Sequence, residues 1–296
     1  MTGSAGAAEN VGSAPGSTSA LQVSFEFFPP KSDEGVQRLR STAAELACRL
    51  PHFFSVTYGA GGSTRDRTLG AVLDLIEAGH PAAPHLSCIG ASRIETAALL
   101  QTWREQGIRR IVALRGDLPS GSVGLGDLRY ASDLVGFIRE QTGSHFHIEV
   151  ACYPEVHPQA RSARDDLLAL KRKVEAGADS AITQYFFNAD AYLRFVDEAR
   201  SAGIRIPIVP GIMPIANFSQ LARFSEACGA EIPRWLRLRM QDLGDDAASI
   251  RALGLDVVTT LCARLVAGGA PGLHFYTMNQ AGLSSEICNR LGIGQA

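Results

Sequence analysis

The sequence predicts a (β/α)8 barrel, or TIM barrel, with extra helices before the last strand. From residue 21 onward, short apolar runs typical of strands alternate with amphipathic stretches typical of helices. Repeated βα units imply a parallel sheet, and the eight strand candidates imply that this sheet closes into a barrel. A length of 296 residues is typical of one such barrel. An open doubly wound sheet is the alternative.

The strand candidates are residues 23–28, 53–59, 83–89, 110–116, 148–154, 180–187, 206–212 and 272–278. Helix patterns lie between them at 33–50, 64–79, 91–107, 131–140, 161–177 and 188–203. Several of these patterns end in glycine, as helices commonly do. The last connection is longer, and the patterns at 217–229, 232–240 and 245–269 predict two or three helices before the final strand.

The first twenty residues are small, polar and aperiodic, and we expect residues 1–20 to be a disordered tail before a single catalytic domain over 21–296. This stretch has neither the basic start nor the apolar run of a signal peptide. No other run is apolar and long enough to span a bilayer. The sequence therefore predicts no membrane segment.

The composition bounds the function. A net charge of -2 provides no electrostatic footprint for nucleic acid or an anionic membrane. The 6 cysteines are widely scattered and include no C-x-x-C pair. This pattern suits reduced thiols in the cytoplasm better than disulfides or a zinc site.

The first strand candidate, VSFEFF, carries a carboxylate among aromatic residues. Because strand side chains alternate between faces, Glu26 shares a face with Ser24 and Phe28. Ionised carboxylates are rarely buried without a partner. Glu26 is therefore either a structural glutamate paired with a barrel arginine or a group that takes part in chemistry.

Polar side chains collect where the predicted strands end, which is where barrel enzymes place their chemistry. They are Glu26, Thr57, Tyr58, His85, Arg115 to Asp117, Tyr153 to His157, Gln184, Tyr276, Asn279 and Gln280. Together these residues outline a site at one end of the barrel.

Two motifs have simpler explanations. The glycine-rich turn at 59–67 has Thr64 where a dinucleotide-binding loop needs its third glycine, so we expect a loop at the barrel mouth. His85 and Cys88 have a metal-ligand spacing, but on a strand they point to opposite faces, and we expect no metal. His85 is then either a hydrogen-bonding residue of the site or a core histidine.

Two basic motifs leave alternatives open. Arg115 and Asp117 follow an apolar strand, and they either bind an anionic group and stabilise a developing cation or are a surface arginine and a capping aspartate. The run Lys171, Arg172 and Lys173 is either a solvated helix face or a clamp for a pyrophosphate.

The segments SFEFFPPK, SVTYGAGGSTRDRT, RIVALRGDLP, CYPEVHP, DLLALKRKVEAGAD and HFYTMN resemble, in order, the bacterial flavin-dependent methylenetetrahydrofolate reductases. The resemblance covers about residues 21 to 294. It implies a barrel enzyme that binds FAD. In a ping-pong scheme, NADH or NADPH reduces the FAD, and the reduced FAD then converts 5,10-methylenetetrahydrofolate to 5-methyltetrahydrofolate. The resemblance favours NADH, and it places the chain in one-carbon metabolism and methionine biosynthesis. We also expect a homo-oligomer.

The resemblance assigns roles to individual residues. It implies that the FAD contacts are Tyr58, Ala60, His85, Arg115, Gly116, Asp117, Ala131, Tyr153, His157, Ala160, Asp166, Arg172 and Lys173. It implies that Thr57 and Gln184 meet the nicotinamide, that Asp117, Gln184 and Gln220 meet the folate, and that Phe224 stacks on bound substrate. Two positions depart from the family pattern: Ala169 replaces a flavin-contacting asparagine, and Gln280 replaces an arginine for the folate's glutamate tail.

The reaction itself needs an acid. Opening the five-membered ring of methylenetetrahydrofolate releases an amine and exposes an iminium carbon that accepts hydride, so a group must protonate the leaving nitrogen. The resemblance places this role on Glu26, and we expect its aromatic neighbours and the charge of Asp117 to raise its pKa. Asp117 is expected to stay ionised and to favour the cationic iminium. The alternatives are a reductase without flavin and a non-catalytic folate-binding subunit.

Overall fold

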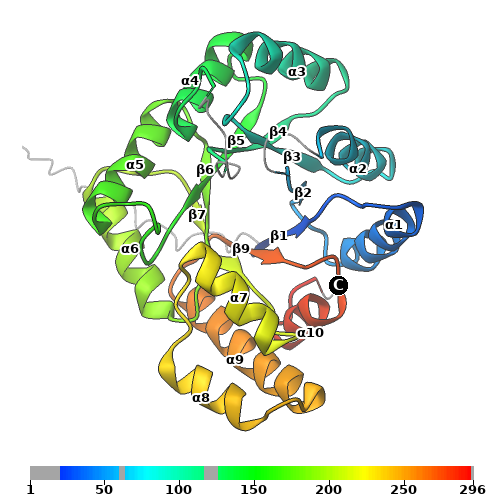
Figure 1. Ribbon diagram of the computed structural model, residues 1–296, viewed down its shortest axis with the longest axis vertical. Helices are drawn as coiled ribbons and strands as arrows, with labels where there is room; N and C mark the ends of the chain where they lie inside the picture. Colours follow the sequence, from blue (N-terminus) through cyan, green and yellow to red (C-terminus); the bar gives the residue numbers. More distant parts are fainter. Residues whose placement is uncertain (1–20, 60–63, 117–125, 295–296) are drawn as a thin grey trace, which may run out of the picture.

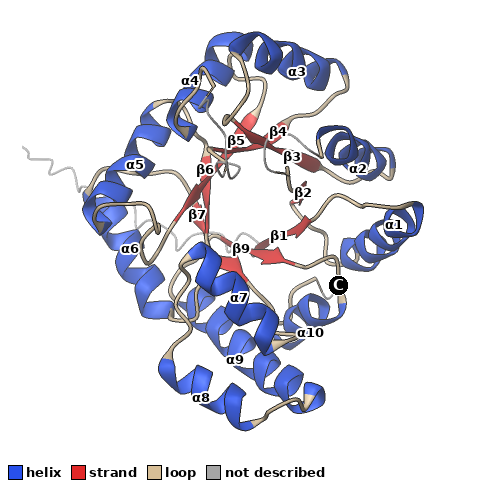
Figure 2. Ribbon diagram, in the orientation of Figure 1, coloured by secondary structure: helices blue, strands red, loops and turns tan. Residues whose placement is uncertain are grey.

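The strands of the protein form one parallel sheet that closes into a barrel (Figures 1 and 2). The computed structural model describes residues 21–59, 64–116 and 126–294. The first strand pairs with both its successor and the last strand, so the sheet closes there. The strands are β1 (Gln22–Phe27), β2 (Phe53–Val56), β3 (Ala82–Ser87), β4 (Arg110–Leu114), β5 (His147–Cys152), β6 (Ser180–Thr183), β7 (Ile208–Val209), β8 (Gly211–Ile212) and β9 (Gly272–Tyr276). The predicted barrel is confirmed, although most strands end earlier than predicted.

The seventh predicted strand is divided at Pro210, which has no N–H to donate to a neighbouring strand. Its first half, β7, pairs with β6, and its second half, β8, pairs with β9. The Gly211 amide donates to Thr183 Oγ1 at 2.9 Å, and the Tyr276 hydroxyl donates to the Thr183 carbonyl at 2.7 Å. A Cβ at position 211 would lie 2.2 Å from that carbonyl and 2.6 Å from the Tyr276 ring. Only glycine fits where the barrel closes.

Helices surround the sheet and cover its outer face (Figure 2). The described helices are α1 (Asp33–Ala47), α2 (Arg65–Glu77), α3 (Arg93–Glu105), α4 (Ala131–Thr142), α5 (Ala163–Glu175), α6 (Ala189–Ser201), α7 (Phe218–Cys228), α8 (Arg234–Asp242), α9 (Ala247–Ala267) and α10 (Gly282–Arg290). Three of them, α7, α8 and α9, lie between β8 and β9, where the sequence predicts two or three helices. Helix α10 was not predicted. Within the described ranges, no helix is long and apolar enough to cross a membrane.

The sheet separates two apolar regions because its side chains alternate between faces. Phe53, Ala83, Val112 and Ile182 form a small cluster inside the barrel. Phe25, Phe27 and the other outward residues belong to the large core shared with the helices. The aromatic residues that flank Glu26 in the sequence therefore point away from its side chain.

A buried charged cluster fills the N-terminal end of the barrel. Glu149 is 2% exposed, pairs with Arg110, accepts a hydrogen bond from Ser180 and lies 3.2 Å from His147 Nε2. Burial alone would raise the pKa of Glu149, but its bond to His147 and the charge of Arg110 lower it. The guanidinium of Arg110 also lies 4.5 Å from the centre of the Phe53 ring. This end is fully paired, as expected for the stabilising end of a barrel.

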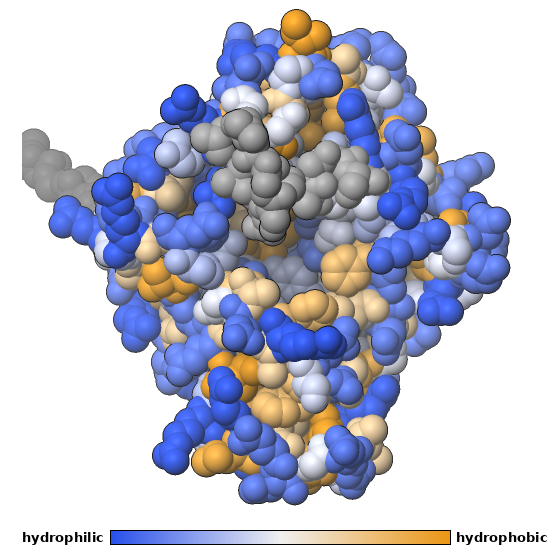
Figure 3. All heavy atoms as spheres, in the orientation of Figure 1, coloured by the Kyte–Doolittle hydropathy of each residue, from blue (hydrophilic) through white to orange (hydrophobic). Residues whose placement is uncertain are grey.

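The molecular surface is mixed (Figure 3). Hydrophilic residues cover the outer helices, and more apolar atoms surround a hollow near the barrel axis. This hollow lies over the ends of the strands, where the polar residues predicted from the sequence gather.

Candidate active site

Glu26 lies inside the barrel between two histidines. Its Oε2 atom is 3.3 Å from Nε2 of His85 and 3.5 Å from Nε2 of His274. The side chain of Glu26 is 14% exposed, that of His85 is 7% exposed, and that of His274 is fully buried. The carboxylate is therefore the member of this cluster that a ligand can reach.

Strand alternation and register build the cluster. On β1, Ser24 and Glu26 both point inward, and they lie beside His274 and Tyr276 of β9. The Ser24 hydroxyl is 2.7 Å from Nδ1 of His274, and the Phe53 ring stacks on the imidazole with 5.9 Å between ring centres. A polar chain of Ser24, His274 and Glu26 thus rises along the inner wall.

This chain fixes where the histidine carries its proton. An imidazole nitrogen that faces an ionised carboxylate must carry a hydrogen, because two lone pairs would repel. Nε2 of His274 therefore carries a hydrogen toward Glu26, and in the neutral imidazole Nδ1 accepts from the Ser24 hydroxyl.

The expectation of a raised pKa for Glu26 is wrong for the protein without ligands. Burial does push this pKa upward, but the charges of His85 and His274 and their hydrogen bonds outweigh it and lower the pKa to about 2. The aromatic neighbours do not contribute as predicted, because Phe25 and Phe27 point outward and Phe28 is 44% exposed. Within the described residues, no arginine pairs with Glu26. The alternative of a structural glutamate paired with a barrel arginine is therefore also wrong, because the partners of Glu26 are histidines.

A tight turn after β9 completes this wall. Met278 and Asn279 both have positive φ angles, 54° and 58°, which are uncommon for residues other than glycine. The Asn279 amide holds the turn: it donates to the Phe28 carbonyl at 3.0 Å and accepts from the Phe28 amide at 2.8 Å. The Thr277 hydroxyl donates to the Glu26 carbonyl at 2.6 Å. The turn therefore joins the ends of β1 and β9 beside the acid.

The basic run on α5 divides between solvent and the barrel. Lys171 forms a surface pair with Glu175 at 3.9 Å, and Arg172 is exposed. Lys173 instead points toward the end of β5, where it donates to the Ala151 carbonyl, and burial lowers its pKa. Among the described residues no carboxylate forms an ion pair with Lys173. Its partly buried ammonium is suited to an anionic ligand.

The loop after β5 is held by an acid on the same helix. Asp166 Oδ2 accepts from the His157 amide at 2.8 Å, and the Ala160 amide donates to the His157 carbonyl at 2.8 Å. The Tyr153 and His157 rings meet edge to face with 4.5 Å between centres. Arg115 reaches the same loop and donates to Gln159. Asp166 therefore supports the loop and need not touch a ligand itself.

Other predicted residues lie at the same strand ends. Gly116 has a φ of 83°, and a Cβ there would meet Ser87 Oγ at 1.9 Å, so this position requires glycine. The Thr57 amide donates to the Phe27 carbonyl at 2.9 Å, and Gln184 Oε1 accepts from its neighbouring amide at 2.9 Å. Burial raises the pKa of Tyr58. Ala131 is the first residue of α4, whereas Ala60 and Asp117 lie outside the described residues.

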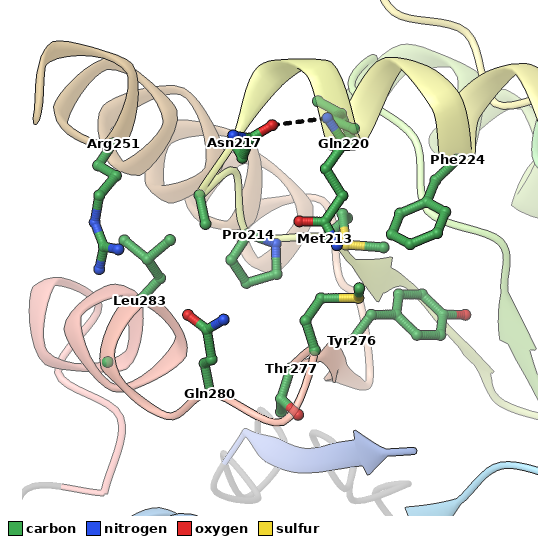
Figure 4. Close-up of a pocket in the computed structure, with 14 residues that line it drawn as sticks. Met213, Pro214, Asn217, Gln220, Phe224, Arg251, Tyr276, Thr277, Gln280 and Leu283 are labelled. Carbon is green, nitrogen blue, oxygen red and sulfur yellow. Dashed lines mark hydrogen bonds between the residues drawn. The ribbon is translucent and has the colours of Figure 1, made fainter. Parts of the chain in front are cut away.

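A pocket lies beside the cluster, between α7, α9 and the turn after β9 (Figure 4). It brings together three residues predicted to bind substrate: Gln220 and Phe224 from α7, and Gln280 from the turn after β9. Tyr276 and Thr277 also line it and connect it to Glu26. Burial, together with the charge of Glu26, raises the pKa of Tyr276 well above its ordinary value.

Three site residues were not predicted: Ser24, His274 and Arg251. Ser24 and His274 carried a signal, because each is a polar residue on the inward face of a strand. Arg251 lies on the long helix α9 and lines the pocket, and no local pattern marks it. In the part of the chain that the structure describes, no group of three or more His, Cys, Asp or Glu residues is arranged to hold a metal ion.

A parallel barrel with a titratable cluster at one end and an aromatic pocket beside it defines a barrel enzyme that acts on a small molecule. The chain belongs to the methylenetetrahydrofolate reductase family, whose profile matches residues 14–292. Proteins named 5,10-methylenetetrahydrofolate reductase from Salmonella typhimurium and Escherichia coli are each 46% identical to it over 274 residues, which cover 92% of this chain and 91% of theirs.

More distant proteins share the barrel. An Arabidopsis thaliana protein named methylenetetrahydrofolate reductase (NADH) 1 is 38% identical over 288 residues, which make up 91% of this chain and 48% of that protein. A solved Clostridium thermocellum protein, described as binding two copies of 5-methyl-5,6,7,8-tetrahydrofolic acid, superposes with a TM-score of 0.63 over 93% of this chain and 95% of that one. At 17% identity this likeness shows the fold alone.

Proposed function

We propose that the protein reduces 5,10-methylenetetrahydrofolate to 5-methyltetrahydrofolate with FAD as its cofactor and NADH or NADPH as the reductant. The observation that carries this proposal is the placement of Glu26 against two imidazoles in a member of this family. The overall reaction consumes one hydride from the nicotinamide and one proton, and the cluster is suited to supply the proton.

The donor set fits an anionic, aromatic cofactor. Lys173 keeps a buried ammonium without a carboxylate partner among the described residues, and Arg172 is exposed nearby on α5. We assign both to the cofactor's pyrophosphate, with Arg115, His157 and Tyr153 on the adjoining loops. When bound, FAD would take hydride from the nicotinamide and give it to the folate. Ala169 contributes no polar contact on this helix.

Glu26 delivers the proton in this scheme. Because its pKa is about 2, the carboxylate is ionised at neutral pH, and the proton that it transfers must come from a neighbour. Nε2 of His85 lies 3.3 Å from Oε2 and Nε2 of His274 lies 3.5 Å from it, so either ring is close enough to supply the proton that the carboxyl group passes to the leaving amine. The acid is therefore the cluster and not the carboxyl alone.

The pocket would hold the folate beside this acid. Phe224 and Tyr276 present aromatic rings, and the Gln220 amide points into the same space (Figure 4). Gln184 and Thr57, at the ends of β6 and β2, are assigned to the nicotinamide, and Gln184 also to the folate. Asp117 is assigned to the cationic iminium, which an ionised carboxylate would stabilise.

An anaerobic flavin titration tests the proposal. The purified protein is expected to bind FAD, to bleach when NADH or NADPH is added, and to recover its absorbance when methylenetetrahydrofolate follows. Hydride transfer from nicotinamide to folate by flavin-free protein would instead establish a reductase without flavin. Folate binding without turnover would establish a non-catalytic subunit.

A further inference from the structure

The pocket beside Glu26 has one cationic side chain and no acidic one among the described residues that line it. That cation is Arg251, in the second turn of α9. The other polar lining groups, Asn217, Gln220, Thr277 and Gln280, are neutral. A ligand that fills this pocket therefore meets a single positive charge, on the exposed side chain of Arg251.

Arg251 has no competing partner among residues 21–59, 64–116 and 126–294, because none of their ion pairs or side-chain hydrogen bonds involves it. By contrast, Arg264 on the same helix and Arg290 on α10 each pair with an aspartate. Because planar guanidinium groups bind carboxylates through two parallel hydrogen bonds, this unpaired group suits a carboxylate ligand.

The two ends of the pocket differ in character (Figure 4). Phe224 and Tyr276 lie at one end, and Arg251 extends toward Gln280 at the other, with Leu283 beside it. A ligand that matches the aromatic end and the cationic end of this pocket has a flat aromatic part at one end and a carboxylate at the other. Gln280 can donate a hydrogen bond to a carboxylate, but it cannot neutralise its charge.

We propose that Arg251 binds the carboxylates of the folate's glutamate tail and so selects folates that carry this tail. This inference rests on the proposed function, and it names which end of the folate lies against α9. It also explains how the pocket can accept an anionic tail although position 280 holds a neutral glutamine.

Binding of 5-methyltetrahydrofolate to the FAD-bound protein tests this role, with the same pterin–aminobenzoate lacking glutamate as the comparison ligand. Arg251→Gln is expected to weaken binding of the glutamate-bearing ligand about tenfold, the effect of losing one charge-assisted contact. The tail-free ligand should change by less than about twofold, since it makes no contact with the charge. Arg251→Lys should retain part of the affinity, because lysine keeps the positive charge but cannot form the two parallel hydrogen bonds of a guanidinium group.

Two controls separate this role from general electrostatics. Arg223 is exposed on α7 and does not line the pocket, so Arg223→Gln should leave both affinities unchanged. Adding Gln280→Arg to Arg251→Gln should restore binding of the glutamate-bearing ligand, because it returns a cation to the same end of the pocket.

The outcomes distinguish the inference from the function it rests on. Suppose that the unmutated protein turns over methylenetetrahydrofolate and that Arg251→Gln weakens binding of neither ligand, or of both ligands equally. The role of Arg251 is then overturned, whereas the proposed function stands. If the unmutated protein neither binds nor reduces a folate, the proposed function and the inference both fall. Reduction of the bound flavin by NADH should be unaffected by Arg223→Gln, which lies outside the pocket.

Discussion

Replacing Gly211 with alanine should destabilise the protein at the point where the barrel closes. The added Cβ would lie 2.2 Å from the Thr183 carbonyl and 2.6 Å from the Tyr276 ring, so the backbone or the ring must move. Overpacking of this kind costs about 1–3 kcal/mol. If the ring moves, the Tyr276 hydroxyl loses its 2.7 Å bond to Thr183, and an unsatisfied buried donor costs roughly 1–3 kcal/mol more.

Gly70 provides a matched control. It lies inside α2, and a Cβ there would meet nothing within 4 Å. Because glycine is less favourable than alanine inside a helix, Gly70→Ala should stabilise the protein by about 0.5–1 kcal/mol. The same chemical change should therefore have opposite signs at the two positions.

Urea denaturation followed by circular dichroism measures both variants against the unmutated protein. We expect the free energy of unfolding to fall by roughly 2–6 kcal/mol for Gly211→Ala, the sum of the two costs, and the midpoint to rise for Gly70→Ala. Equal stability of Gly211→Ala and the unmutated protein would refute the packing described at the β8–β9 junction.

Three further predictions concern the site. Lys173→Met should lower FAD affinity by about one to two decades, the usual effect of losing a charge-assisted contact, whereas Lys171→Met should not; equal flavin retention on dilution by both variants would refute the pyrophosphate assignment. The folded pKa of Glu26 is lowered from 4.5 to about 2, so its stabilising contribution is complete above pH 4.5 and is lost as the pH falls through about 2. The difference in unfolding free energy between the unmutated protein and Glu26→Gln should therefore shrink across that window, and a difference that grows on acidification would contradict the assigned direction. Ser24→Ala leaves the buried Nδ1 of His274 without its partner, so it should cost about 1–3 kcal/mol of stability and slow folate reduction more than flavin reduction by NADH; unchanged rates would show that Ser24 does not orient the imidazole.

Much of the fold was predictable because it depends on local periodicity. Apolar runs marked every strand of the barrel, and the long last connection predicted two or three helices before β9, where the structure has three. Helix α10 was missed, since its sequence GLSSEICNR is short and begins after Ala281, which provides no side-chain cap. The division of the seventh strand follows from Pro210, a local signal that the prediction did not use.

Many of the predicted site residues lie near the same end of the barrel, but the electrostatics of Glu26 were not predictable from the sequence. Glu26 was found from its place in β1, yet the sign of its pKa shift depends on His85 and His274, which are distant in sequence. Sequence neighbours such as Phe25 were the wrong guide, because alternate strand residues face opposite sides of the sheet. Arg251 also needed the structure, since only the packing of α9 against the turn after β9 brings it to the pocket.

The most direct test of the account is the effect of Glu26→Gln on the two half-reactions, measured separately by stopped-flow flavin absorbance. The variant keeps the size of the side chain and removes the carboxyl group that we propose delivers the proton. Flavin reduction by the nicotinamide releases no amine, so it should proceed at close to the unmutated rate. Reoxidation by methylenetetrahydrofolate should slow by ~100- to 10,000-fold, the usual loss when a general acid is removed. Reoxidation at near the unmutated rate, or an equal fall of both half-reactions together with stability, would contradict the role assigned to Glu26.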